Sequence, residues 1–220
     1  MKLTFDSIRK NLLIKTYIKK ADDALLALGY TEHSFPHVLR VSEVAATILQ
    51  TLGYSDHEVE LVRIAGYMHD IGNLVNRVDH SQSGAVMAFR MLSELNGEAE
   101  DIADIVSTIG NHDEGTGVPI SPMAAALILA DKSDVRKSRV RNTKADAFDI
   151  HDRVNFSVTS SQLSIDDAKE NITLSLVIDT EVGSVMDYFE IFLDRMILCR
   201  KAAAKLGLQF KLNINGQTLL

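Results

Sequence analysis

The chain has 220 residues, of which 46% are hydrophobic and 24% charged, which fits one large soluble domain, or a domain of about 150 residues with a small appendage. The formal net charge of −7 excludes a general basic field for nucleic acid or anionic membranes, and the single cysteine, Cys199, excludes an intramolecular disulfide and a thiolate zinc cage. No apolar run approaches the roughly 18 residues of a membrane helix and the N-terminus lacks a signal-peptide pattern, so we expect a cytoplasmic protein without a membrane partner.

The first 150 residues predict a series of helices, because apolar side chains recur three or four positions apart. Gly29 and Gly53 follow the first two apolar patterns as stop signals, and Ser55 or Asp56 can cap the third. The expected helices cover residues 8–28, 37–52, 56–72, 82–95, 98–110 and 123–138.

After Asp149 the apolar period changes from about 3.6 to 2, which indicates strands with one buried face. We expect strands near residues 154–158, 172–178 and 208–214, with a helix at 182–206 between the last two. The predicted fold class is mainly α: a helical domain over residues 1–149, followed by a small α+β unit over residues 150–220. In this unit a β-β-α-β order would place the helix on a small antiparallel sheet.

Histidine and aspartate side chains stand at the ends of several predicted helices, where apolar residues would be expected. The pair His69-Asp70 closes one apolar helix, and Asp131 follows seven apolar residues in another. A buried carboxylate is costly unless it is paired or ligated. Three more histidines lie at predicted helix ends or between helices: His37, His80 and His112. Side chains that point inward from several helices are the usual way in which a bundle builds a metal site.

The residue types indicate which metals such a site would bind. Neutral imidazole and carboxylate suit Mn, Fe, Co, Ni or Zn, and the absence of sulfur argues against a structural zinc. An aspartate has two oxygens and can bridge two ions, whereas each histidine offers one nitrogen. Two ions roughly 3.5–4 Å apart can activate a water and neutralise a phosphoryl oxygen.

The order and approximate spacing of His37, the His69-Asp70 pair and Asp131 resemble the H…HD…D signature of the HD-domain superfamily of metal-dependent phosphohydrolases. The resemblance covers roughly residues 30–140 and implies an all-helical bundle that binds divalent transition metal. It also implies two ions with Asp70 as the bridge, and the following ligands: His37, His69, Asp70 and Asp131 for one ion, His80 and His112 for the other.

Two subfamilies resemble parts of this pattern. The stretch around His112, NHDEGTGVP, looks like a shortened form of a motif in the cyclic-di-GMP phosphodiesterases of the HD-GYP type, but it differs from that pattern at Asn111, Val118 and Asn73. The enzymes that cleave dinucleoside tetraphosphates are also small and have one histidine at the position of His112. They usually carry a lysine near position 73, however, and lack a C-terminal sheet, so neither subfamily matches this chain in full.

A basic segment follows the last predicted ligand directly. Residues 132–141 contain five lysine or arginine residues in an otherwise acidic protein. If the helix continues to residue 138, Lys132, Arg136 and Arg139 would line one face of it. We expect Lys132 and Arg136, the cations nearest Asp131, to bind a substrate phosphate. A solvated helix end whose cations favour the C-terminal dipole is the alternative.

These observations predict a phosphohydrolase that cleaves a nucleotide or another small phosphate ester through a metal-activated water, with Asp70, Lys132 and Arg136 as the catalytic residues. The alternatives are a metal- and nucleotide-binding sensor without turnover, or a di-iron oxygenase of the HD-type fold. If His80 and His112 are structural, a single-metal site remains. Asn73 and Asn111 are candidates for orienting the ligands, and the C-terminal unit is a candidate surface for a homodimer.

Overall fold

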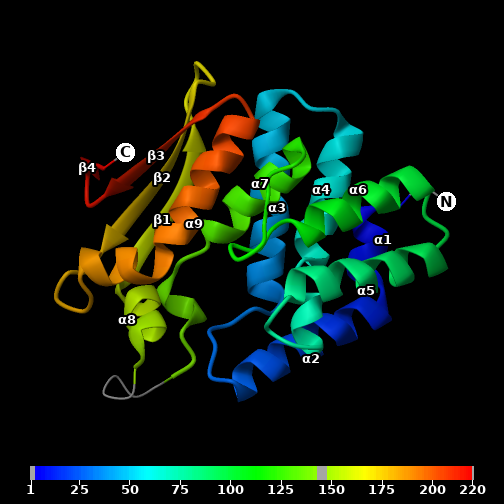
Figure 1. Ribbon diagram of the computed structural model, residues 1–220, viewed down its shortest axis with the longest axis horizontal. Helices are drawn as coiled ribbons and strands as arrows, with labels where there is room; N and C mark the ends of the chain where they lie inside the picture. Colours follow the sequence, from blue (N-terminus) through cyan, green and yellow to red (C-terminus); the bar gives the residue numbers. More distant parts are fainter. Residues whose placement is uncertain (1–2, 143–147, 220) are drawn as a thin grey trace.

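The computed structural model describes residues 3–142 and 148–219. A helical part and a small sheet lie side by side, with the chain termini at opposite ends of the molecule (Figure 1). The helices are α1 (Phe5–Lys10), α2 (Leu12–Ala27), α3 (Phe35–Leu52), α4 (Asp56–Met68), α5 (His80–Glu94), α6 (Ala99–Gly110), α7 (Pro122–Lys132), α8 (Ile150–Ser157) and α9 (Val185–Lys205), with short 3-10 helices η1 (Ile71–Leu74) and η2 (Lys137–Arg139). The strands are β1 (Val158–Ile165), β2 (Asn171–Ile178), β3 (Gln209–Ile214) and β4 (Gln217–Thr218). The predicted mainly α class with a small C-terminal α+β unit is confirmed.

Helix α7 lies at the centre of the helical part. It packs against α3, α4 and α6 on the bundle side and against α9 on the other (Figure 1). Nearly all of its side chains are buried, which explains why its sequence, PMAAALILADK, is apolar on every face. The end of this helix carries Asp131, so the most deeply packed element of the fold positions one of the predicted ligands.

The C-terminal sheet is mixed, and the expectation of an antiparallel sheet is only partly met. The strand order is β1-β2-β3-β4, with β1 antiparallel to β2 but β2 parallel to β3. Helix α9 connects β2 to β3. Because such a strand–helix–strand connection brings the chain back to the end of the sheet at which the first strand began, β3 runs parallel to β2. Helix α9 therefore fills the space between the sheet and α7, and apolar residues of both parts form one continuous core.

Three predicted elements differ from those observed. Residues 8–28 form two helices rather than one, because the Asn11 side chain accepts a hydrogen bond from the Ile14 N–H and caps a new helix. Residues 154–157 of the strand expected at 154–158 form the second half of α8, which Asp149 caps, and only Val158 belongs to a strand, as the first residue of β1. Val154 and Val158 are four positions apart and fit both periods.

The third difference concerns the basic segment. Helix α7 ends at Lys132 rather than near residue 138, so Lys132, Arg136 and Arg139 do not share a helix face. The carboxylate of Asp134 is held by His37 and Arg136, and Arg139 donates to the Asp134 carbonyl at 2.6 Å. These contacts draw the chain away from the helix axis directly after Asp131.

Candidate metal centre

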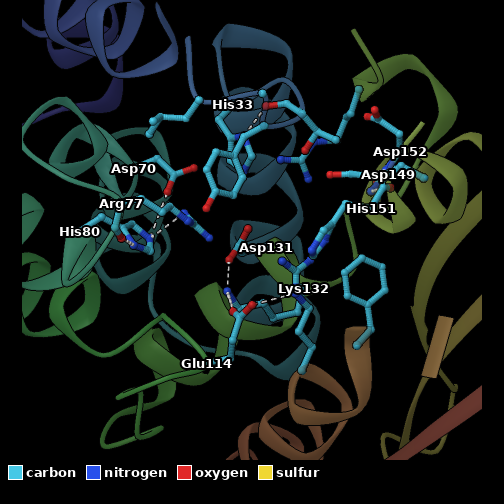
Figure 2. A pocket seen from close by; sticks show the side chains of 18 residues that line it. His33, Asp70, Arg77, His80, Glu114, Asp131, Lys132, Asp149, His151 and Asp152 are labelled. Atoms are coloured by element: carbon cyan, nitrogen blue, oxygen red, sulfur yellow. Dashed lines mark hydrogen bonds and ion pairs between the residues drawn. The ribbon is translucent and has the colours of Figure 1, made fainter. Parts of the chain in front are cut away.

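All six residues predicted as metal ligands lie in one cluster, and each comes from a helix end. His37 is in the first turn of α3, His69 and Asp70 follow α4, His80 begins α5, His112 follows α6, and Asp131 is the penultimate residue of α7. The four imidazoles are between 0% and 2% exposed, and Asp70 is 5% exposed. Helix ends from five helices therefore enclose a set of buried polar side chains, some of which are labelled in Figure 2.

Four of these side chains form what we call the first group: His37, His69, Asp131 and the Oδ2 atom of Asp70. The Nε2 atoms of His37 and His69 are 3.3 Å apart. Asp70 Oδ2 lies 3.5 Å from the first of these nitrogens and 3.3 Å from the second. Asp131 Oδ1 lies 3.4 Å and 3.7 Å from the same two atoms. Two nitrogens and two oxygens thus face a common point.

The second group consists of His80, His112 and the other oxygen of Asp70, Oδ1. The Nε2 atoms of the two histidines are 3.2 Å apart, and Asp70 Oδ1 lies 3.4 Å and 4.0 Å from them. The two oxygens of Asp70 therefore face different histidine pairs.

The hydrogen bonds of the outer ring nitrogens fix the tautomer of every histidine in the cluster. The Nδ1 atoms of His69, His80 and His112 lie 2.8, 3.1 and 2.7 Å from main-chain carbonyl oxygens, which can only accept. His37 Nδ1 lies 2.8 Å from the Asp134 carboxylate. Each Nδ1 therefore carries its hydrogen, and each Nε2 points into the cluster, where it offers a lone pair to a cation once it is deprotonated.

Two observations show that the cluster fits a bound cation. Nitrogen lone pairs that face one another at 3.2–3.3 Å repel unless a proton or metal lies between them. Asp70 Oδ2 is buried and has no hydrogen-bond partner among residues 3–142 and 148–219, which is costly for a carboxylate oxygen. Metal–ligand bonds of about 2.0–2.2 Å place ligand atoms of one ion roughly 3–3.5 Å apart, in the range found here. The donor set is nitrogen and carboxylate oxygen, as predicted for a transition metal.

The two groups differ in their electrostatics. Burial disfavours the charged form of His69, but the adjacent Asp70 and Asp131 carboxylates outweigh burial and raise its pKa to about 10. The pKa of His37 is raised to about 8 against burial by Asp131, Asp134 and Asp70. In the second group burial prevails, and the pKa values of His80 and His112 are lowered. The first group therefore attracts positive charge more strongly than the second.

Backbone features around Gly72 set the distance between the groups. A Cβ atom at Gly72 would lie within about 2 Å of the His80 carbonyl oxygen, so only glycine lets η1 pass this close to the start of α5. Asp79, directly before His80, has a φ of 57°, in the left-handed region that aspartate tolerates better than most residues. Together these features bring His80 back beside Asp70, ten positions earlier in the chain.

Two side chains outside the ligand set hold it in place. Asn73 donates to Asp70 Oδ1 at 3.0 Å and to the Asp70 carbonyl, which agrees with the predicted orienting role. Asn111 instead donates to the Ser107 carbonyl and does not contact the cluster. Asp134 is 1% exposed and bonds His37, and Arg40, Arg136 and Arg139 all lie within ion-pair distance of its carboxylate. His37 is thus oriented by a carboxylate that is itself held by three arginines.

A cavity of about 440 Å³ opens beside the cluster and is lined by Asp70, His80 and Asp131. Lys132 also lines it, but its side chain is buried and paired with Asp131 Oδ2 at 2.7 Å and with Glu114. Arg136 is not among the lining residues; it pairs with Asp134 and Glu32.

Several cavity residues have no counterpart among the predicted ones: His33, Arg77, His151 and Arg195. Arg195 belongs to α9 and donates to Glu114 at 2.9 Å, so the C-terminal unit forms part of the cavity wall. The wall of this cavity is shown in Figure 2. Of the four, Arg77 and His33 lie close to predicted ligands in the chain, whereas the positions of Arg195 and His151 depend on how the C-terminal unit packs.

None of the described helices is both long enough and apolar enough to cross a membrane. Over 206 aligned residues, the chain is 24% identical to an uncharacterized protein of Methanocaldococcus jannaschii, and the alignment covers 83% of this chain and 78% of that relative. The family model of the HD domain matches residues 35–136, the segment that contains all six ligand candidates. Residues 35–136 of this chain therefore match an HD domain, and the His/Asp cluster of the structure fits the metal site of such a domain.

Proposed function

We propose that this protein is a two-metal phosphohydrolase that hydrolyses a small phosphate ester, with nucleotides as the first substrates to test. The observation that carries the proposal is the position of Asp70, whose two oxygens face two separate histidine pairs at 3.3–4.0 Å. One carboxylate shared in this way supports two cation positions rather than one.

The residues divide between the two positions as their distances suggest. The first group would hold one ion, and His80 and His112 would hold the other, with Asp70 between them. When bound, divalent ions supply Lewis-acid stabilisation of phosphoryl oxygens and lower the pKa of a coordinated water.

The protein's own residues prepare the site for this chemistry. The Nδ1 hydrogen bonds hold all four imidazoles in one tautomer, so little reorganisation accompanies metal binding. Lys132 lies between Asp131 and Glu114 and holds Asp131 Oδ2, which leaves Oδ1 directed at His37 and His69. In this proposal Lys132 is a positioning residue.

The first experiment is elemental analysis of protein purified anaerobically, beside His80→Ala, His112→Ala and a control, His57→Ala. His57 is a partly exposed histidine that pairs with Asp101 away from the cluster. We expect about two transition-metal ions per chain in the wild type and the control, and about one in each of the other variants. A single ion that survives both substitutions would contradict the two-metal assignment.

The metal identified in this way is then used in a screen of phosphate mono- and diesters, including nucleotides. Release of inorganic phosphate or of an alcohol, lost in Asp70→Asn, would support the proposal. Nucleotide binding without turnover would favour a sensor. Oxygen consumption with Fe(II) would favour an oxygenase, because hydrolysis does not consume oxygen.

A further inference from the structure

Arg77 differs from every other cationic side chain near the cluster. It is partly buried and lines the cavity, between η1 and the start of α5. Lys132 and Arg195 are paired with carboxylates, and so are Arg136 and Arg139. Across the described residues, no carboxylate lies within ion-pair distance of the Arg77 guanidinium. Its positive charge is therefore available to a ligand in the cavity.

Neutral contacts hold this guanidinium beside the second group. Its Nη1 atom donates to Asn73 Oδ1 at 3.2 Å, and the same Asn73 side chain donates to Asp70 Oδ1. The guanidinium carbon lies 5.6 Å from the centre of the Tyr30 ring, a distance suited to a cation–π contact. The carbonyl of Arg77 also accepts from His80 Nδ1, so the residue is fixed by main chain and side chain together.

The position of Arg77 creates an electrostatic demand for an anion. Its Nη1 atom lies 3.5 Å from His80 Nε2, the atom that faces the second cation position. A guanidinium and a divalent ion at such close range repel each other in a buried site, and the two carboxylates nearest that nitrogen, Asp70 at 3.4 Å and Asp113 at 3.9 Å, would have to balance the ion as well as Arg77. In Figure 2 the Arg77 side chain is directed into the cavity, toward the side on which Asp131 lies. A group bound there would meet the cluster on one side and Arg77 on the other.

We propose that Arg77 binds a phosphate oxygen of the substrate beside the second group. This inference rests on the proposed phosphohydrolase function and adds the residue that holds the transferred phosphoryl group. The planar guanidinium can donate two parallel hydrogen bonds to phosphate, which a lysine ammonium cannot do. Arg77, rather than Lys132 or Arg136, then supplies the unpaired positive charge that an acidic protein needs to attract an anionic substrate.

The test measures binding of inorganic phosphate, a product of phosphate ester hydrolysis, to metal-loaded protein by isothermal titration calorimetry. The variants are Arg77→Gln, Arg77→Lys and a control, Arg90→Gln. Arg90 is an exposed arginine of α5 whose partner is Glu94. Loss of charge-assisted hydrogen bonds predicts roughly 10- to 100-fold weaker phosphate binding in Arg77→Gln. We expect an intermediate loss in Arg77→Lys and no change in Arg90→Gln, with the metal content unchanged in all three.

The outcomes separate this inference from the proposed function. If the wild type hydrolyses a phosphate ester but Arg77→Gln retains its phosphate affinity and KM, the role of Arg77 is overturned and the function stands. If the wild type hydrolyses nothing but binds phosphate in an Arg77-dependent manner, the anion site stands and the function fails. A gain of one metal ion in Arg77→Gln would also overturn the inference, because the guanidinium would then occupy a cation position.

Discussion

The two ligand groups share Asp70 but are held in different ways. In the first group His37 is bonded to a buried carboxylate, Asp134, that three arginines hold, and a second carboxylate, Asp131, faces the same point. In the second group the Nδ1 atoms of both histidines are held by main-chain carbonyls, and Asp113 lies 3.9 Å from His80 Nε2. Arg77, which has no carboxylate partner among the described residues, stands beside this group.

This difference indicates that the two groups bind cations with different affinity. Two carboxylates make the first group the stronger cation site, because each adds attraction that burial does not cancel. The second group has fewer anionic partners and lies beside the cation proposed to hold the substrate. We therefore expect the first ion to bind more tightly and the second to exchange more readily, and the following predictions address that contrast.

The largest effect is expected where the two groups meet. Asp70→Asn preserves the volume of the side chain but removes the charge that both cation positions share. We expect hydrolysis to fall by at least about 10³-fold, and the metal content to fall below one ion per chain. Steady-state kinetics and elemental analysis provide the measurement. A variant that retained two ions would show that the groups do not depend on a shared carboxylate.

A large loss of stability is expected at the wall of the first group. Lys132→Met would remove the cation that Asp131 and Glu114 share and leave Glu114 with Arg195 alone, and loss of one partner of a buried pair costs about 3–5 kcal/mol. The midpoint of urea unfolding should therefore fall clearly. The double variant Lys132→Met with Glu114→Gln should recover part of this loss. No recovery would mean that Lys132 contributes through packing rather than charge.

The role of the Asp134 carboxylate in orienting His37 can be tested without substituting a metal-ligand candidate. Asp134→Asn keeps a hydrogen-bond acceptor for His37 Nδ1 but removes its charge, and changes of this kind typically weaken metal binding about 10- to 100-fold. Competition with a chromogenic chelator should show this loss for the tighter of the two ions only. Weakening of both ions to the same degree would contradict separate roles for the two groups.

Metal affinity should depend on pH mainly in the first group. Without metal the pKa of His37 is about 8 and that of His69 about 10, so near pH 7 a cation must displace protons there. Affinity should rise as pH rises, by up to roughly tenfold per pH unit for each displaced proton. The lowered pKa values of His80 and His112 predict little dependence for the second ion. Calorimetric titrations in buffers of different ionisation enthalpy would count the released protons.

The smallest effect is expected for Arg136→Gln. This side chain does not line the cavity, and it is one of three arginines that hold Asp134. We expect less than about a threefold change in phosphate affinity, measured beside Arg77→Gln. A larger loss would favour the original expectation that the basic segment after Asp131 binds the phosphate.

The sequence predicted the ligand cluster well because its signal is local. Each histidine or aspartate stands where an apolar helix begins or ends, and helix ends meet in a bundle. The sequence did not point to Arg77, the phosphate anchor proposed above, because five cations in one segment are a stronger signal than a single arginine in a loop. Only the tertiary structure shows that Lys132 and Arg136 are paired with carboxylates, whereas Arg77 has no carboxylate partner in the part of the chain that the structure describes.

Other features depended on contacts that a linear pattern does not contain. The end of α7 is set by Asp134, whose partners include His37 from a distant helix. Val154 and Val158 fit a strand and a helix equally well, and the cap at Asp149 decided between them. The place of Arg195 in the cavity wall requires α9 to pack on α7, which no periodicity in α9 alone could indicate.

The separation of the ligands along the chain has a further consequence. The hydrogen bond between His37 and Asp134 joins positions 97 apart, and each histidine pair joins positions 32 apart. Ions bound here would act as cross-links that close long loops of the unfolded chain. Such cross-links lower the conformational entropy of the unfolded state and so stabilise the folded one. Chelation would then loosen the whole domain, so in a cell the supply of metal would control the lifetime of this protein as well as its activity.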